Sequence, residues 1–383
     1  MKIALVYPKY TTHGGTERFL FNFSRQLLDM GHEVHLVVGK VDGPVDRRII
    51  VHKVPIIKLG KFLKVLSFLL FSQRILKKYQ FDIVQGFGRT IKQDVFRAGG
   101  GCHKEYRKNV LRKNKNPLLR FFKLYLPHQL LLLYIEKRQF LKINFRKIMA
   151  VSNQVKKEIV SNYRVPEEDI VVIYNGVDTK AFNPGNRERY FSEVRKRFDI
   201  KLNEKVILFL GTGFERKGLS FLIQAFAILQ DNYPDTRLLV VGKDNDIQRY
   251  VHLSEGLRIA NRVVFTGPQS DVKMCYAAAD VFVLPTLYEP FGNVCLEAMA
   301  SGLPVITSRV NGVAEIMNGM DHLLLNDPSD IEDMAWKIGF LLADNVEREK
   351  IAIAARKIAE RYTISNNAQQ FVNLYQTVLE RNV

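Results

Sequence analysis

The sequence predicts an α/β protein of two domains, each built from strands that alternate with helices. Short apolar segments recur along the chain, and segments of helical periodicity separate them, which is the βαβ pattern. Glycine-rich loops follow several of the apolar segments, where the next helix begins. At 383 residues the chain is longer than one hydrophobic core usually holds, so two domains are expected.

The first predicted strand, residues 2–7, is followed by Gly14 and Gly15 and then by an amphipathic helix. Glycines at this place let the backbone approach a ligand at the helix start. The full dinucleotide-binding fingerprint is absent, so an ordinary tight turn is the alternative explanation. Further strands are predicted at residues 33–38 and 82–86.

A second glycine-rich passage, residues 94–103, contains three successive glycines and ends in His103. Successive glycines allow unusual backbone angles and a close approach of other groups. His103 could act as a general acid or base, or bond a hydroxyl group of a ligand. A single histidine is more often structural, and Cys102 beside it is expected to be a small buried residue.

The second half of the chain repeats the order of strand, loop and helix. A buried strand is predicted at residues 206–210, and a glycine-rich loop carries Arg216 and Lys217 to the start of a helix. Two cations and the N–H groups of a helix start can balance the charge of a diphosphate. Taken alone, the pair would more often be surface charge. Further strands are predicted at residues 238–242, 263–267 and 280–285.

Two carboxylates, Glu289 and Glu297, lie eight residues apart after the last of these strands. Glu289 is predicted in the loop after the strand and Glu297 in the following helix. Ligands of open α/β sheets bind at such loops. Backbone N–H groups from Phe291 onward would be unpaired at the helix start and could hold an anion or a polar ligand. Two solvated surface glutamates are the alternative.

Residues 286–307 combine the E-x7-E spacing with the ending Ala-x-Ala-x-Gly-x-Pro-Val-Ile, and resemble the nucleotide-sugar glycosyltransferases of family 4. Members of that family are retaining enzymes with two facing Rossmann-like domains, the GT-B fold. The resemblance covers nearly the whole chain. It implies an acceptor-binding domain at 1–170, a nucleotide-sugar-binding domain at 171–364, and a C-terminal helix at 365–383 that returns to the first domain.

The resemblance also implies roles for site residues. Arg216 and Lys217 would stabilise the donor diphosphate, Glu289 would bond the hydroxyls of the sugar, and Glu297 would bond the ribose. A histidine lies in the acceptor-side loop of the family, where this chain has His103. The family leaves the protein nucleophile unassigned. The remaining donor-binding residues would be Gly14, Gly15, Phe291, Gly292 and Asn293.

No cofactor and no metal ion are expected. Asp244-Asn245-Asp246 matches the D-x-D metal motif of a different glycosyltransferase fold. We expect a loop and a helix cap there, because cationic side chains already serve the diphosphate.

Within the family, the chain is most similar to glucosyltransferases that extend the heptose of the lipopolysaccharide core. That similarity implies transfer of a hexose, from UDP-glucose, to a lipid-linked or lipopolysaccharide-core saccharide. Pro290-Phe291-Gly292 is common across the wider family, so the donor stays open. The matching residues are Gly14-Gly15 followed by Arg18, Asp94-Val95, Arg216-Lys217-Gly218 and the two glutamates.

The formal net charge of +18 is concentrated in two stretches of the chain. Residues 104–147 contain thirteen Lys or Arg and two acidic residues, and residues 58–78 contain six basic residues and no acidic one. Nucleic acid, anionic membrane or an acidic substrate could bind such a surface. No element that reads nucleic acid is found, so none is expected as a partner.

Aromatic rings interleave with the cations of the larger basic stretch, which suits the headgroup region of an anionic membrane or a phosphorylated acceptor. The apolar segment 62–71 is favoured as a helix packed on the sheet, with a membrane-facing patch as the alternative. The membrane or acceptor surface is predicted at Arg112, Lys113, Lys115, Arg120, Phe121, Phe122 and Lys123.

The expected location is the cytoplasm, peripherally on the inner face of the cytoplasmic membrane. The N-terminus lacks the pattern of a signal peptide, and no uncharged apolar run approaches the roughly 20 residues of a membrane-spanning helix. The three cysteines are not spaced as metal ligands and suit a reducing compartment. A nucleotide-sugar epimerase, a phosphorylase of the same fold, and a nucleic-acid-binding protein are the alternatives.

Overall fold

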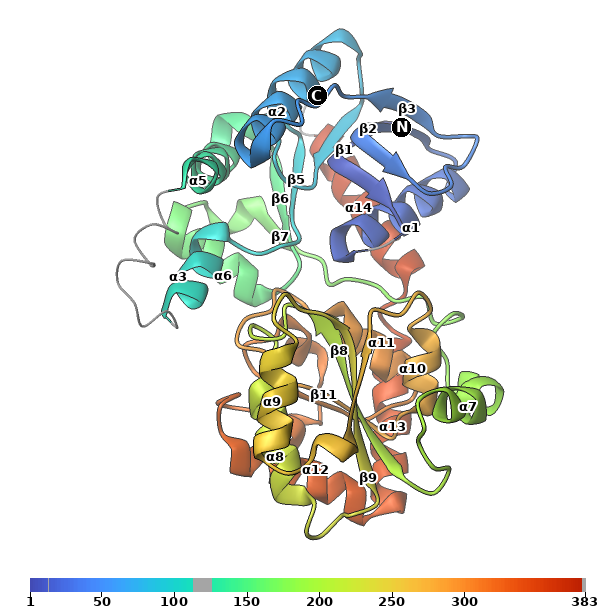
Figure 1. Cartoon of the computed structure of the whole chain (residues 1–383). Coiled ribbons are helices and arrows are strands. Elements are labelled where there is room, and N and C mark those ends of the chain that lie inside the picture. Colours follow the sequence, from blue (N-terminus) through green and yellow to red (C-terminus); the bar gives the residue numbers. More distant parts are fainter. Residues whose placement is uncertain (13, 113–125, 381–383) are drawn as a thin grey trace. The chain divides into compact units, whose positions relative to one another are not determined.

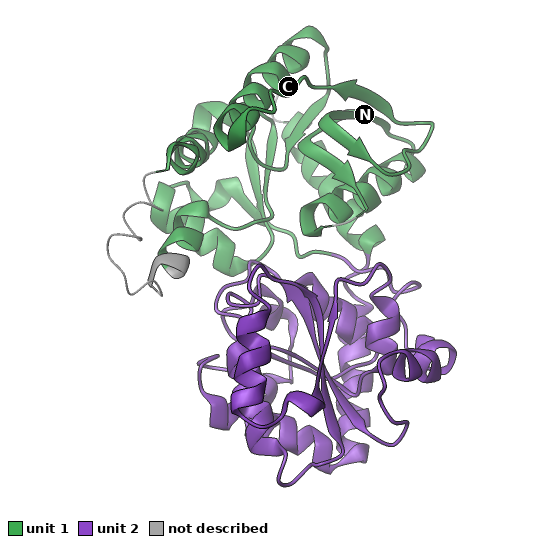
Figure 2. Ribbon diagram, viewed as in Figure 1, with its two compact units in different colours: residues 1–175, 364–383 green, residues 176–363 purple. Residues whose placement is uncertain are grey.

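The computed structural model describes residues 1–12, 14–112 and 126–380, and the chain forms two compact units. Unit 1 comprises Met1–Asn175 and Ile364–Val383, and unit 2 comprises Gly176–Thr363 (Figure 2). Each unit has its own parallel sheet and its own layers of helices, so the predicted α/β fold of two such domains is confirmed.

The sheet of unit 1 has seven parallel strands (Figure 1). In chain order they are β1 (Lys2–Thr11), β2 (Glu33–Asp42), β3 (Ile50–Lys53), β4 (Ile83–Gly86), β5 (Val95–Ala98), β6 (Lys147–Ala150) and β7 (Ile170–Val172). Across the sheet their order is β3-β2-β1-β4-β5-β6-β7.

Helices of unit 1 form because apolar side chains recur at helical spacing and can be buried on one face. In α1 that face carries the buried Leu20, Phe23 and Leu27. The C-terminal helix packs on α1, where the rings of Phe371 and Phe23 lie 4.8 Å apart. The helices are α1 (Gly15–Asp29), α2 (Gly60–Lys78), α3 (His103–Arg112), α5 (Pro127–Gln139), α6 (Asn153–Tyr163) and α14 (Ile364–Glu380), with short 3-10 turns at Lys142–Asn144 and Glu167–Asp169.

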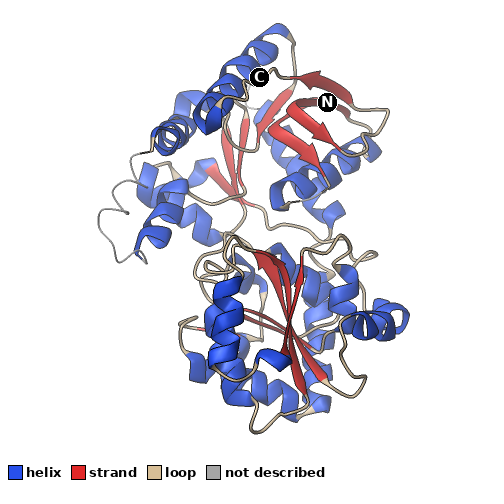
Figure 3. Cartoon of the chain, viewed as in Figure 1, coloured by secondary structure: helices blue, strands red, loops and turns tan. Residues whose placement is uncertain are grey.

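Unit 2 has a six-stranded parallel sheet with helices on both faces (Figure 3). Its strands are β8 (Lys205–Thr212), β9 (Thr236–Lys243), β10 (Val263–Gly267), β11 (Val281–Leu284), β12 (Val305–Ser308) and β13 (Leu324–Leu325). Their order is β10-β9-β8-β11-β12-β13. The helices are α7 (Asn186–Arg197), α8 (Leu219–Leu229), α9 (Gln248–Gly256), α10 (Lys273–Ala278), α11 (Asn293–Ala300), α12 (Ile331–Ala343) and α13 (Asn345–Ala359), with 3-10 turns at Ala260–Arg262, Gly312–Ile316 and Asp321–Leu323.

In both sheets the first strand of the unit is a topological switch point: the next strands along the chain lie on one side of it, and the later strands lie on the other side. In unit 1, β1 lies between β2 and β4, and in unit 2, β8 lies between β9 and β11. The loops that leave the carboxyl ends of the two central strands diverge at such a switch point and leave room for a ligand. The fold therefore offers one ligand position in each unit, above β1 and β4 and above β8 and β11.

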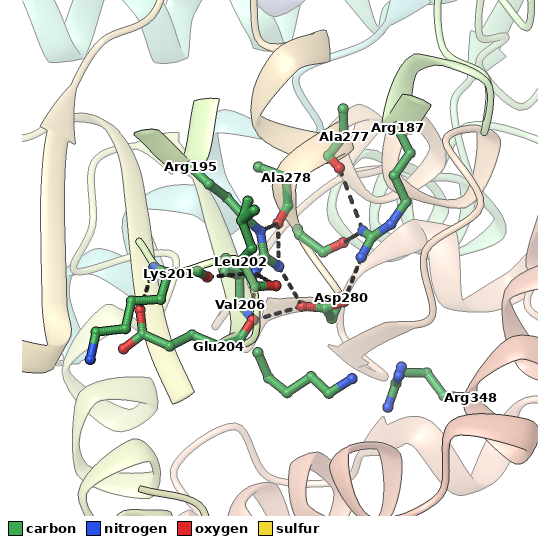
Figure 4. A network of polar contacts seen from close by, with 12 residues as sticks. Arg187, Arg195, Lys201, Leu202, Glu204, Val206, Ala277, Ala278, Asp280 and Arg348 are labelled. Atoms are coloured by element: carbon green, nitrogen blue, oxygen red, sulfur yellow. Dashed lines mark hydrogen bonds and ion pairs between the residues drawn. The ribbon is translucent and has the colours of Figure 1, made fainter. Parts of the chain in front are cut away.

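A buried ion pair fixes the opposite ends of β8 and β11 (Figure 4). Arg195 is 1% exposed, and its Nη2 lies 2.9 Å from Oδ2 of Asp280, the residue before β11. The same oxygen of Asp280 accepts a hydrogen bond of 2.8 Å from the N–H of Val206 in β8. The guanidinium also donates to the carbonyls of Leu202 and Ala278, so the arginine is well satisfied. This network sets the register of the two strands that carry the ligand position of unit 2.

The predicted boundary after residue 170 is too early. Residue 170 is the first of β7, and β7 pairs with β6 inside the sheet of unit 1. Unit 1 therefore continues to Asn175. The C-terminal helix begins at Ile364 and belongs to unit 1, where Asn367 donates to the carbonyl of Tyr174 over 2.6 Å.

The apolar segment 62–71 lies in α2 and is only partly core. Val65, Phe68 and Leu69 are buried, as the favoured prediction requires, while Phe62 and Leu70 are exposed. Among the helices of the described residues, none combines the length and the hydrophobicity needed to cross a membrane.

Candidate active site

The ligand position of unit 2 is bounded by two loops that are joined through their backbones. The loop after β8 ends with Arg216 and Lys217, and the loop after β11 begins at Pro285. The carbonyl of Arg216 accepts hydrogen bonds from the N–H of Leu287, at 2.9 Å, and from Oγ1 of Thr286, at 3.1 Å. The two loops therefore hold their side chains in fixed relation to each other.

Gly218 is required by the close approach of these loops. Its φ of 75° is left-handed, and a Cβ atom at this position would lie 2.0 Å from the carbonyl oxygen of Pro285. Any other residue would push the loops apart. Helix α8 begins directly after this glycine.

Glu289 holds both cations of the β8 loop. One oxygen, Oε2, lies 2.9 Å from Nζ of Lys217 and 2.9 Å from Nη1 of Arg216. Nη1 of Arg216 also donates to the carbonyl of Tyr288 over 2.6 Å. The side chains of Lys217 and Glu289 are 9% and 16% exposed, and that of Arg216 is 28% exposed. The cluster is thus largely shielded from solvent, yet open on the side of Arg216.

The protonation state of Glu289 follows from this geometry. Burial raises its pKa, but the charges and hydrogen bonds of Lys217 and Arg216 act in the opposite direction and lower the pKa to about 2. Glu289 is therefore a carboxylate at every physiological pH, and the cluster carries one net positive charge. An anionic ligand is attracted to such a cluster.

The segment around Asn311 holds the backbone of the Glu289 loop in place. Asn311 was not identified from the sequence. The N–H of Gly312 donates to the carbonyl of Glu289 over 3.0 Å, in a parallel bridge between Glu289 and Asn311. The fully buried side chain of Asn311 donates to Oγ1 of Thr307 over 2.9 Å. It also lies against Gly292, whose added Cβ would come within 2.4 Å of Oδ1 of Asn311. The pair Asn311-Gly312 after β12 is the feature of the sequence that could have indicated a structured turn here.

Helix α11 places the remaining predicted donor residues. Gly292 is its N-cap, with a left-handed φ of 79°, and Asn293 is its first residue. Phe291 is 2% exposed, so its side chain belongs to the core and only its backbone can serve a ligand. Glu297 is 4% exposed, and its Oε2 lies 3.1 Å from the hydroxyl of Tyr276.

The D-x-D sequence forms the predicted loop, between β9 and α9. Oδ2 of Asp244 accepts from the N–H of Phe214 over 2.7 Å, and Oδ1 accepts from the N–H of Asp246 over 2.9 Å. Asp244 therefore organises the end of β9 against the loop after β8.

Gly14 and Gly15 lie at the ligand position of unit 1, after β1 and at the start of α1. Gly14 is the N-cap of α1 with a left-handed φ of 98°, and its carbonyl accepts from the N–H of Arg18 over 3.1 Å. A Cβ on Gly14 would lie 2.5 Å from a carboxylate oxygen of Glu17. The glycine is thus needed for the backbone conformation of this turn.

His103 is the first residue of α3, and its ring is half-buried. The carboxylate of Glu136 accepts hydrogen bonds from the N–H groups of His103 and Lys104 and so caps the helix. Nε2 of the histidine lies 2.8 Å from Oε1 of Gln129. Burial lowers the pKa of His103 and the bond to Gln129 opposes this, while the charges of Arg107 and Arg89 lower the pKa further.

The structure thus brings Arg216, Lys217 and Glu289 into direct contact, with Gly292 and Glu297 on the adjoining helix. Gly14, Gly15 and His103 belong to unit 1. Arg112 is the last residue of α3. The predicted surface residues that lie outside the described residues are Lys113, Lys115, Arg120, Phe121, Phe122 and Lys123.

Two family models match the chain, one in each half. The model described as Glycosyltransferase Family 4 matches residues 13–181, and the model described as Glycosyl transferases group 1 matches residues 191–358. The chain belongs to glycosyltransferase family 4. The basic and acidic side chains at the ligand position of unit 2 are thus those of a family 4 glycosyltransferase.

Relatives of this family 4 glycosyltransferase act on different acceptors. The lipopolysaccharide glucosyltransferase WaaG of Escherichia coli is 27% identical over 319 residues, or 82% of each chain. The D-inositol 3-phosphate glycosyltransferase of Corynebacterium urealyticum is 35% identical over 231 residues. That match covers 58% of this chain and 54% of the relative, so it spans about half of the relative's length.

Solved structures agree on the GT-B fold. The crystal structure of WaaG matches with a TM-score of 0.82 at 24% identity, covering 97% of this chain and 99% of WaaG. Anabaena HepE in complex with UDP-glucose matches with a TM-score of 0.75 at 20% identity, covering 98% of this chain and all of HepE.

Replacing Glu289 by glutamine tests the ion-pair cluster through its pH dependence. The pKa of Glu289 is about 2 in the folded chain, against an ordinary value of 4.5. The carboxylate therefore stabilises the fold fully above pH 4.5, and this contribution is lost as the pH falls from there towards 2. We expect the wild type to exceed Glu289→Gln by up to about 3 kcal/mol in free energy of unfolding at neutral pH.

Urea denaturation measures this difference, with the fluorescence of Trp336, the single tryptophan, as the probe within unit 2. Glu347→Gln on α13 is the control, because its ion pair with Lys350 is solvent-exposed and worth less than about 1 kcal/mol. A difference for Glu289→Gln that stays constant from pH 7 to pH 3 would contradict the ion-paired carboxylate.

Proposed function

We propose that this glycosyltransferase moves a hexose from a nucleotide diphosphate sugar to a saccharide acceptor, with retention of the anomeric configuration. The observation that carries the proposal is the contact of Arg216, Lys217 and Glu289 above β8 and β11. Two cations at the start of α8 suit a diphosphate, and an adjacent carboxylate suits the hydroxyls of a sugar.

UDP-glucose is the donor that we propose. HepE, which shares the fold, is described in complex with UDP-glucose, and WaaG is described as a glucosyltransferase. In the free protein, Glu289 is the negative partner of Arg216 and Lys217. In the proposed complex, the diphosphate takes this place. Glu289 and the backbone from Phe291 to Asn293 are then available to the sugar, and Glu297 bonds the ribose.

Catalysis, in this proposal, stabilises the charge that develops on the departing diphosphate. Negative charge grows on the phosphate oxygens as the glycosidic bond to the donor breaks, and Arg216 and Lys217 are held where they meet that charge. Because the hydrogen bonds between the two loops already fix the positions of both cations, little reorganisation is needed at the moment of reaction. We assign no protein nucleophile and no metal ion to this chemistry.

Unit 1 takes the acceptor in the proposal, with His103 at the reacting hydroxyl, and Gly14 and Gly15 are proposed as donor-binding residues. The acceptor is a lipid-linked or lipopolysaccharide-core saccharide, which would place the enzyme in biosynthesis of the cell envelope. The match to WaaG over 82% of both chains supports this choice. A location in the cytoplasm, peripheral at the membrane, agrees with three cysteines that are all free and buried.

A transfer assay with product analysis tests the proposed reaction. We expect an α-linked hexose in the product from UDP-glucose, because the donor is α-linked and the configuration is retained. Proton NMR of the anomeric signal measures it, and activity should persist in a chelator of divalent cations. An inverted product, a free epimer, or a complete loss in chelator that manganese restores would each contradict part of the proposal.

Vesicle co-sedimentation tests the membrane partner. The excess of basic residues at 104–147 predicts binding to anionic vesicles, since each Lys or Arg near such a surface is worth about 1 kcal/mol and salt screens it. Replacing Arg112, Lys113, Lys115, Arg120 and Lys123 by glutamine should weaken the binding and preserve transfer to a short soluble acceptor. Equal binding to neutral and anionic vesicles would contradict the electrostatic docking.

A further inference from the structure

Two cations of unit 2 share one uncharged oxygen atom at the amino ends of its strands. Nζ of Lys205, the first residue of β8, lies 3.2 Å from Oδ1 of Asn345, the first residue of α13. Nη2 of Arg348, on the first turn of the same helix, lies 2.5 Å from that oxygen. Because both groups donate to one atom, their charged nitrogens are at most about 6 Å apart, where like charges repel.

No carboxylate balances this pair of cations, in contrast to the pair at the carboxyl ends of the strands. There, Arg216 and Lys217 share an oxygen of Glu289, whose negative charge offsets their repulsion. The amide of Asn345 carries no net charge and leaves the repulsion at the amino ends in place. In the part of the chain that the structure describes, neither cation on Asn345 forms an ion pair with a carboxylate.

The carboxylate of the strand before them is already occupied. Oδ1 of Asp280 lies 2.9 Å from Nη2 of Arg187, and Oδ2 lies 2.9 Å from Nη2 of Arg195 (Figure 4). The N–H of Val206, the residue after Lys205, donates to Oδ2 of the same carboxylate over 2.8 Å. One carboxylate between two guanidinium groups leaves one net positive charge, so this network adds to the surplus beside Lys205.

The carboxylates at the start of α13 also have other partners. Asp344 is the N-cap of the helix, and its Oδ1 accepts from the N–H groups of Val346, at 2.8 Å, and Glu347, at 3.0 Å. Oε2 of Glu347 lies 3.3 Å from Nζ of Lys350. The surplus of positive charge at the amino ends of the strands is therefore a property of the folded unit.

The pKa of Lys205 agrees with this surplus. Burial lowers the pKa, the positive charge of Arg348 lowers it further, and Asp280 opposes both, while Arg187 and Arg195 act in the same direction as Arg348. An anion close to such an ammonium group would favour its charged form. The side chains of Lys205 and Arg348 are only half-buried, so a ligand from solvent can reach them.

We propose that Lys205 and Arg348 bind a phosphate group of a soluble ligand, with Asn345 holding the two side chains together. A guanidinium can donate to two phosphate oxygens at once, and an ammonium adds a compact charge with further donors. A phosphate between the two cations replaces their repulsion by two attractions.

The donor diphosphate does not account for this site. The donor is proposed at the carboxyl ends of the strands, and the eight residues of β8 separate those ends from Lys205 by roughly 23 Å. The proposal therefore stands apart from the proposed transfer reaction, and a failure of one leaves the other to be judged separately.

An NMR titration of the full chain with inorganic phosphate tests the site at neutral pH, with sodium chloride keeping the ionic strength constant. The readout is the backbone N–H signals of residues 205 and 345, which report on this end of the sheet. Lys205→Gln removes one cation and Arg348→Gln the other. Lys350→Gln is the matched control, because Lys350 is an exposed cation on the same helix and is paired with Glu347.

We expect saturable shifts of both signals in the wild type. Lys205→Gln and Arg348→Gln should each weaken the affinity about tenfold, as for the loss of a hydrogen bond between charged groups, and Lys350→Gln should leave the affinity unchanged. Absence of shifts in the wild type, or an equal loss of affinity in Lys350→Gln, would overturn the site, since phosphate would then sense only the net charge.

Urea denaturation followed by the fluorescence of Trp336 is a second measurement. Without phosphate, Lys205→Gln should unfold at the same or a higher urea concentration than the wild type, because one of two repelling cations is gone. Phosphate should raise the midpoint of the wild type more than that of Lys205→Gln, because a ligand of the folded chain stabilises it. An equal rise in both proteins would count as general salt stabilisation and would contradict the site.

Vesicles of phosphatidylglycerol separate lipid phosphate from soluble phosphate. We expect the signals of residues 205 and 345 to respond to inorganic phosphate without any lipid. Shifts with the vesicles and none with inorganic phosphate would assign the cations to a lipid headgroup and overturn the soluble ligand.

Discussion

The shared ion pair of Glu289 with Lys217 and Arg216 is the interaction on which the ligand position of unit 2 depends. Two cations next to each other repel, and a largely buried lysine loses hydration, so neither would stay at this place without a carboxylate. The carboxylate in turn is held by the bridge to Asn311, and the two loops approach closely because residue 218 is glycine. The Arg195–Asp280 network at the far ends of β8 and β11 keeps the strands under these loops in register.

Much of this arrangement could be predicted because it is local in the sequence. The strand, glycine loop and helix around Arg216 and Lys217 form one continuous segment, and the spacing of Glu289 and Glu297 sets both on one loop and helix. The contact itself could not be predicted from the residues alone, because Lys217 and Glu289 are 72 positions apart and meet only through the order of strands in the sheet. Asn311 was missed in part for the same reason, since its side chain bonds Thr307 of the neighbouring strand but also packs against Gly292, which lies in the loop before α11.

In unit 1, three features could not be predicted from patterns in the sequence. The boundary at residue 170 was wrong because the short strand β7 pairs with β6 of unit 1, and the pairing partner of a strand cannot be read from its own residues. His103 was predicted as a ligand-binding group, and the structure adds that Glu136, 33 positions away, fixes its backbone. Arg89, in the loop between β4 and β5, has a left-handed φ of 62° with the buried residues Phe87 and Thr90 on either side, and nothing in the sequence predicts this conformation.

Calorimetry with UDP and with uridine tests most directly whether the cluster at Glu289 is a diphosphate site. We expect Lys217→Gln to bind UDP about tenfold more weakly than the wild type, as for the loss of a hydrogen bond to a charged group, while the affinity for uridine is unchanged. Equal losses for UDP and uridine, or no loss for UDP, would show that the cluster does not bind the diphosphate.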